Sequence, residues 1–304
     1  MTTEKSMISR AEKQFDEEKS REDDKEKSRE EERMNSRGTT ILLYIGLLVG
    51  LCLLAYPSMA DYWNSFRQSQ VIMDYSSRVS NMNSEVYRKL IEDAEAYNRE
   101  LSRTGIQWEM DEAQLERYWS LLDVDGTGIM GYIEIPKINV KLPIYHGTDV
   151  GILQTSVGHI QETSLPVGGS GSHCALSGHR GLPSAKLFSD LNRVLEGDTF
   201  TISILNETYT YEVDQIRVVS PQILNPLNII PGEDLCTLVT CTPYGVNSHR
   251  LLVRGHRVKN AGVGAEVIAD AMQLEPAFVA PFVMAPILAG GILFLFLNTA
   301  AKRL

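Results

Sequence analysis

The residue best suited to covalent chemistry is Cys241, which ends the β-branched run TLVTC and is followed by the turn sequence TPYG. A strand that ends at a cysteine and turns on proline and glycine presents the thiol at the rim of a sheet, where a substrate can approach. The alternative is a buried and inert thiol, the usual state of a cysteine in a folded protein. The turn favours the accessible thiol, whose thiolate form is a nucleophile.

Two other residue types could assist such a nucleophile. Arg250 begins the next apolar run, and the intervening loop is long enough to fold back and place its guanidinium beside the thiol. An exposed arginine on an edge strand is the equally simple alternative. His179 ends the run HCALSGH, where a strand gives way to a loop containing glycine and proline. Spacing alone does not select it from the six histidines, of which the others are His146, His159, His173, His249 and His256.

The elements that must position these residues are short β-branched runs separated by Gly, Pro, Asn and Asp. The runs occupy 131–140, 141–147, 173–179, 199–213, 215–220, 236–241 and 250–258. Their period of two predicts a closed or sandwich-like, antiparallel-rich β domain over residues 127–260. One insert, residues 182–194, is predicted to form a helix between strands.

Helical spacing precedes this domain, over residues 61–126. Apolar residues recur at helical intervals from Val86 to Leu101, behind a predicted N-cap at Ser84, within a helical region expected over 62–102. A second short helix is predicted at 111–122. The apolar stripe of the first helix must pack against the β domain or against the helix before it.

Two long uncharged runs frame the middle of the chain, at 38–60 and 276–301, and each is long enough to span a membrane. A cleaved signal peptide is the alternative for the first run, and a buried core helix is the alternative for the second. Arg33 and Arg37 before the first run, and the basic tail 302–304 after the second, predict cytoplasmic flanks. A multi-pass protein of the cell membrane is therefore expected, with its β domain outside and a linker at 261–275.

Composition bears on the leader and on the partners and cofactors that can be expected. Alternating charges and few apolar residues predict that the leader, residues 1–37, is disordered. The net charge of −10 includes no strongly basic segment, so nucleic acid is not expected as a partner. The four cysteines contain no CxxC pair and no phosphate-cradling glycine loop is present, so neither a metal nor a cofactor is expected.

These motifs together resemble the sortase family of Gram-positive bacteria. TLVTC followed by Arg250, with SGHRG upstream, looks like the sortase active-site segments, and YIEIPKI, LPIYHGT, TSLPVGG and SGHRGLPSAKLF look like the class C, pilin-polymerising branch. The resemblance covers roughly residues 62–300. It implies a mainly β fold, a sortase-type closed β-barrel with short helices, preceded by a helical segment and flanked by two transmembrane helices. It also implies that Cys241, His179 and Arg250 are catalytic.

The resemblance implies a cysteine transpeptidase. Cys241 would attack the Thr–Gly bond of an LPXTG-type sorting signal, and the thioester would pass to a lysine amine of a pilin subunit. The alternatives are a cell-wall anchoring sortase or a thioester hydrolase, and a catalytically silent membrane scaffold. Thr240 and Tyr244, which flank Cys241, are candidate substrate-binding residues.

Two details depart from, or add to, the family pattern. Many class C sortases close their cleft with a lid bearing an Asp-Pro-aromatic motif, and this chain contains no Asp-Pro. We expect a variant lid in which Trp108 covers the cleft; alternatively, the aromatic residues near it only anchor the 111–122 helix. Cys174 and Cys236 lie at equal offsets before His179 and Cys241, which would bring them side by side on neighbouring strands. We expect two reduced, buried thiols; a disulfide between them is the alternative.

Overall fold

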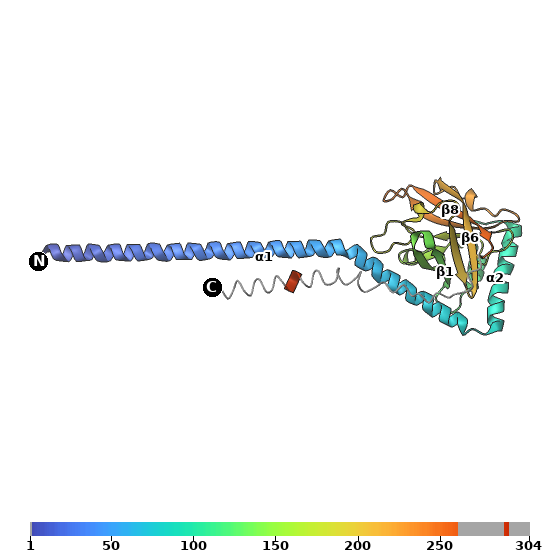
Figure 1. Ribbon diagram of the computed structural model, residues 1–304, viewed down its shortest axis with the longest axis horizontal. Coiled ribbons are helices and arrows are strands. Elements are labelled where there is room, and N and C mark those ends of the chain that lie inside the picture. The colour runs from blue at the N-terminus through green and yellow to red at the C-terminus, as the bar shows by residue number, and fades with distance from the viewer. Residues whose placement is uncertain (1, 261–288, 292–304) are drawn as a thin grey trace. The chain divides into compact units, whose positions relative to one another are not determined.

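The computed structural model describes residues 2–260 and 289–291 (Figure 1). Contacts divide the chain into one unit of residues 1–55 with 274–304 and a second unit of residues 56–273. Helix α1, Thr2–Ser80, contains an apolar window with a mean hydropathy of 2.2, none of it buried. It is long and apolar enough to span a membrane. The predicted second span, 276–301, lies outside the described residues except for three helical positions.

The leader differs from the expectation of disorder, because α1 begins at Thr2 and residues 2–37 are helical. The leader contains no glycine or proline, and it is rich in Glu, Lys and Arg, which are good helix formers. Continuity with the apolar run also removes the cost of starting a separate helix.

The helical region between the apolar run and the β domain is divided into three helices. After α1 ends at Ser80, α2 runs over Ser84–Thr104 and α3 over Glu112–Ser120. The predicted cap at Ser84 was wrong by one residue, because Asn83 is the N-cap and its side chain accepts from the backbone N–H of Glu85 at 2.8 Å. Helix α3 begins with a capping box between Asp111 and Gln114.

Eight strands close into a barrel in the order β1-β2-β3-β4-β7-β8-β6-β5 (Figure 1). They are β1 Ile129–Ile135, β2 Val140–His146, β3 Val157–His159, β4 Ser172–Ser177, β5 Thr199–Ile204, β6 Glu207–Val219, β7 Asp234–Thr242 and β8 His249–Val258. Neighbours are antiparallel except for the parallel pairs β2–β3 and β4–β7. The predicted closed β-barrel is confirmed.

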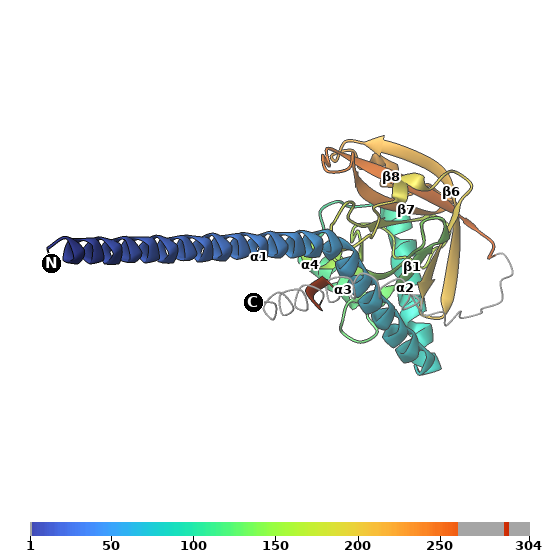
Figure 2. The same ribbon diagram turned by 60° about the vertical axis from the view of Figure 1, so that its left-hand side comes forward.

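The helices are part of the same core as the barrel. Tyr75 of α1, Ala94 and Tyr97 of α2, and Tyr118 of α3 are buried with the barrel interior. The Tyr75 hydroxyl donates to the carbonyl of Met130 at 2.6 Å and accepts from the N–H of Leu205 at 2.7 Å, and burial raises its pKa. Figure 2 shows the last part of α1 and the whole of α2 along the outside of the barrel.

The insert 182–194 was predicted wrongly as a helix. It is irregular apart from the 3₁₀ turn η2, Leu191–Arg193, because its backbone groups bond to other parts of the chain. The N–H of Lys186 donates to the Asp61 carboxylate at 2.7 Å, and the carbonyl of Ser184 accepts from the Asn64 amide at 2.7 Å. The remaining short elements are η1 Pro136–Ile138, α4 Val150–Leu153 and η3 Asn225–Leu227.

Candidate active site

Strand register brings the three candidate catalytic residues to one end of the barrel. In the antiparallel pair β7–β8, Cys241 lies opposite Arg250. In the parallel pair β4–β7, Ser177 lies opposite Val239, so the same register continued by two residues brings His179 level with Cys241. Backbone contacts extend that register, because the N–H of Gly178 donates to the carbonyl of Val239 at 3.1 Å.

All three side chains belong to the outer face of the barrel wall. Alternation along β7 places Cys236 and Leu238 in the interior core, and therefore Val239 and Cys241 on the opposite face. Ala175, Val239 and Leu252, one from each of β4, β7 and β8, form a separate buried apolar cluster with Leu227. The cluster therefore lies on the same outer face as Cys241, which is itself partly exposed.

Thr240 joins the ends of β4 and β7 and does not share the outer face with Cys241. The residue is 2% exposed, and its hydroxyl donates to the carbonyl of Gly178 at 2.7 Å. The contact fixes the backbone immediately before His179 to the residue immediately before Cys241. The burial of Thr240 and its bond to Gly178 suit a residue that positions the site better than the substrate contact predicted from sequence.

Tyr244 lies where the loops after Cys241 and His179 meet. It is 65% exposed, and its ring covers Gly181, where an added Cβ would stand 2.7 Å from Cε2 of the ring. Gly181 also has φ of +79°, a backbone conformation that side chains other than glycine rarely adopt. The exposed ring near Cys241 is available for the predicted contact with substrate.

Arg180 is a positioning residue that sequence analysis missed. Its guanidinium donates to the carbonyl of Ser189 at 3.2 Å, the hydroxyl of Thr242 at 3.1 Å and the amide oxygen of Asn192 at 2.9 Å. It thus ties the loop after His179 to the residue after Cys241. Its place inside SGHRG, next to His179, was the only signal in the sequence. That signal does not indicate a role, because the role depends on hydrogen-bond partners that are distant in the sequence.

Arg250 rests on its own loop in the structure. Its Nη1 donates to the carbonyls of Asn247 at 3.3 Å and His249 at 3.2 Å. Within residues 2–260, no hydrogen bond joins the side chains of Cys241, His179 and Arg250 to one another. The register sets the three side chains on one face, and a substrate between them would complete the contacts.

The other histidines have structural partners or face elsewhere. His146, His159 and His173 are fully buried, and both ring nitrogens of each contact an oxygen atom. Burial lowers the pKa of His173 to about 4. His249 adjoins Arg250 in β8 and therefore points to the opposite face.

Comparison with known proteins agrees with this geometry. A family model described as Sortase domain matches residues 133–258. The crystal structure of sortase C1 from Streptococcus agalactiae is 57% identical, covers 63% of this chain and 99% of its own, and superimposes with a TM-score of 0.62. The chain belongs to the sortase family. The closed β-barrel and the class C resemblance expected from sequence are thereby confirmed, whereas the second of the two expected transmembrane helices stays a prediction.

Two further sortases are similar over the same region. Sortase C from Clostridium perfringens, solved with the C-terminal cell wall sorting motif, is 41% identical, covers 63% of this chain and 99% of its own, and has a TM-score of 0.56. Sortase D from Bacillus subtilis is 30% identical over 131 residues, which are 42% of this chain. The chain spans 63% of the length of that curated relative.

Trp108 lies in the connection between α2 and α3. It is half-buried against the apolar cluster of Ala175, Val239 and Leu252. These residues share the outer face with Cys241 and are one alternation away from it on β7. The tryptophan therefore covers this apolar cluster.

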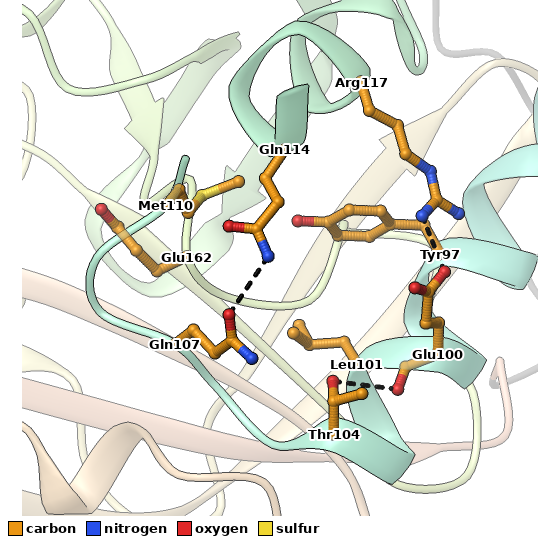
Figure 3. A pocket seen from close by; sticks show the side chains of 9 residues that line it. All are labelled: Tyr97, Glu100, Leu101, Thr104, Gln107, Met110, Gln114, Arg117 and Glu162. Atoms are coloured by element: carbon orange, nitrogen blue, oxygen red, sulfur yellow. Dashed lines mark hydrogen bonds and ion pairs between the residues drawn. The ribbon is translucent and has the colours of Figure 1, made fainter. Parts of the chain in front are cut away.

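A cavity of about 100 Å³ lies behind the Trp108 segment, between α2 and α3 (Figure 3). Its lining includes Gln107 and Met110, which flank the tryptophan, but none of the three catalytic candidates. Gln114 donates to Gln107 at 3.1 Å across the cavity, and Arg117 donates to Glu100 at 2.7 Å (Figure 3). The cavity therefore belongs to the support of this segment and is separate from the catalytic residues.

The cysteines of the barrel core behave as expected from the strand pattern. Cys174 and Cys236 are opposite each other in β4 and β7, buried, and free of a disulfide. Burial raises the pKa of the Cys236 thiol. The prediction of a reduced, buried pair is confirmed, and Cys241 is the one barrel cysteine in residues 56–260 that is partly exposed.

Proposed function

We propose that this sortase is a cysteine transpeptidase that cleaves an LPXTG-type sorting signal between Thr and Gly and joins the Thr carbonyl to a pilin lysine. The observation that carries the proposal is the alignment of Cys241, His179 and Arg250 at one end of β4, β7 and β8. A nucleophile, a proton carrier and a permanent cation on one face are the parts that acyl transfer requires.

The first half of the reaction forms the thioester. The Cys241 thiolate attacks the Thr carbonyl carbon, whose oxygen becomes an oxyanion. Arg250 donates to that oxygen and cannot lose its own proton, and a donor of this kind typically contributes about 2.7–4 kcal/mol to the transition state. Within the described chain only Nη1 of its guanidinium is engaged, so other N–H groups remain for the substrate. His179 protonates the departing Gly amine as the C–N bond breaks.

The second half transfers the acyl group. The lysine amine attacks the thioester carbon while His179 accepts its proton, and the Cys241 sulfur leaves as thiolate. An isopeptide bond replaces the thioester, and the enzyme returns to its starting state. The likeness to Sortase C of Streptococcus pneumoniae, whose crystal structure is described as giving insights into pilin substrate specificity, supports a pilin lysine as the acceptor.

We propose that the apolar part of the signal binds in a groove above the cluster of Ala175, Val239 and Leu252. The floor of Ala175, Val239 and Leu252 is suited to the Leu-Pro portion, and Tyr244 stands at its catalytic end. For that portion to bind, Trp108 must move off the floor. We therefore propose that the Trp108 segment is a lid, a role consistent with its burial on the same surface.

Membrane attachment suits this substrate. We propose that residues 38–60 and 276–301 both span the cell membrane and that the catalytic domain lies outside. A membrane-bound sorting signal then meets the enzyme at a high effective concentration.

The acceptor and the nucleophile can be tested together on the full chain in detergent. Incubation with an LPXTG-type peptide should give a mass increase localised to Cys241, which a lysine-bearing pilin fragment converts to an isopeptide product. Cys52→Ala, which removes an exposed cysteine of α1, is the matched control and should form the same adduct. Resolution by water alone would make the enzyme a hydrolase, and the absence of any adduct would favour a silent scaffold.

A further inference from the structure

The part of α1 that follows the apolar run uses one face to hold the catalytic domain. Asp61, Asn64 and Gln68 form a stripe along the helix. Asp61 accepts from the N–H of Lys186, Asn64 donates to the carbonyl of Ser184, and Gln68 donates to the carbonyl of Thr155 at 2.5 Å. The helix therefore holds the loop that follows His179.

The opposite face carries large apolar side chains that nothing covers in the described chain. Met59, Trp63 and Phe66 are 49%, 54% and 48% exposed. At about 3.6 residues per turn they share one side of the helix, opposite the stripe of Asp61, Asn64 and Gln68. We call Met59, Trp63 and Phe66 the aromatic patch.

Within the aromatic patch the two rings lie near each other, and an arginine lies at its edge. The rings of Trp63 and Phe66 are 6.5 Å apart, and the Arg67 guanidinium lies 5.3 Å from the centre of the Trp63 ring. The next position on this face is Gln70, so the patch ends within two turns. Tryptophan and phenylalanine beside an arginine are the composition of a membrane interface.

The distance from the apolar run identifies what covers the patch. The expected span ends near Ala60, and a rise of about 1.5 Å per residue puts Trp63 about 5 Å and Phe66 about 9 Å beyond it. The headgroup layer on each side of a bilayer is roughly 5–8 Å thick. Even a fully extended chain could carry Phe66 no more than about 22 Å from Ala60. The patch therefore cannot leave the neighbourhood of the bilayer surface.

We propose that the aromatic patch inserts into the outer interface of the membrane, with Arg67 at the lipid phosphates. The proposal rests on the first span and does not depend on the catalytic function. Because the other face of the helix holds Ser184 and Lys186, the same few turns join the lipid surface to the His179 loop. The N–H of Phe188, later in this loop, donates to the carbonyl of His179 at 3.1 Å. The patch thus sets the height and orientation of the catalytic end above the membrane.

Tryptophan quenching in phosphatidylcholine nanodiscs tests the proposal on the full chain. The difference in fluorescence emission between the wild type and Trp63→Phe is the contribution of Trp63. Phenylalanine at this position keeps the helix face apolar. Lipids carry bromine either near the headgroup end or near the methyl end of an acyl chain, and iodide is added as an aqueous quencher. We expect strong quenching of Trp63 by headgroup-proximal bromine, weaker quenching by methyl-end bromine and little by iodide.

The control is the emission removed by Trp108→Phe, which should show no dependence on bromine because Trp108 is packed on the barrel. Quenching of Trp63 by iodide instead of bromine would show that the patch faces water. Protection from both quenchers would show that another protein surface covers it. Stronger quenching at the methyl end would place it in the hydrocarbon core. Each of these three results overturns the proposal, and none depends on catalytic activity.

Discussion

Replacing Thr240 with valine removes the hydroxyl that fixes the strand before His179 to the strand before Cys241. The side chain keeps its shape, but the buried carbonyl of Gly178 loses its 2.7 Å partner. An unsatisfied buried group costs about 1–3 kcal/mol. For a domain of this size, each kcal/mol lowers the melting temperature by about 2–4 °C, so a drop of roughly 6 °C is expected.

The same substitution should slow the reaction through position alone. A shift of His179 relative to Cys241 lowers kcat by up to about a hundredfold, whereas KM for the sorting peptide stays nearly constant because the groove floor is unchanged. Peptide cleavage and thermal unfolding of the full chain measure the two effects. Thr201→Val, in β5 on the other side of the barrel, is the matched control. If both variants behave alike in kcat and in melting temperature, Thr240 does not position the site.

Four further predictions concern the site and the core. His179→Ala should lower kcat/KM by several orders of magnitude, and Arg250→Lys should lose most activity because a point charge replaces a planar fork; an active lysine variant would refute the oxyanion contact. Trp108→Ala should speed alkylation of Cys241 by a bulky maleimide, and an unchanged rate would refute the lid. Because burial lowers the pKa of His173 to about 4, the folded state resists protonation, so stability is full above about pH 6.5 and falls by roughly 3 kcal/mol as the pH drops to 4. Acid unfolding should show this slope, and His173→Gln should reduce it.

Much of the barrel was predictable because its β-branched runs are bounded by turn residues. These runs mark β1, β2, β4, β7 and β8, and the turn after Cys241 marks the end of β7. The run 199–213 joined β5 to most of β6, and the separate run 215–220 is the end of β6. Strand β3 has only three residues, too few to show a period, so it was missed. The insert 182–194 has helix-forming residues, but the side chains of Asp61 and Asn64, more than a hundred residues earlier, take its backbone hydrogen bonds.

The catalytic site was predictable in its residue types but not in its assembly. Cys241 and Arg250 lie in consecutive strands joined by one loop. The length of that loop was enough to indicate from sequence that the two residues could lie close together. His179 enters through the parallel pairing of β4 with β7, which connects residues about sixty positions apart and leaves no local signal. The contacts of Thr240 and Arg180 are likewise side-chain bonds between distant loops, and only the folded structure reveals them.

The most direct test of the central claim is the yield of transpeptidation product from the full-length Cys241→Ala variant, measured by mass spectrometry against the wild type and Cys52→Ala. We predict no detectable isopeptide product and no cleaved sorting peptide from Cys241→Ala, with wild-type yield from Cys52→Ala, because Cys241 alone forms the thioester. Product from the Cys241→Ala protein would contradict the assignment of this thiol as the nucleophile and, with it, the proposed mechanism.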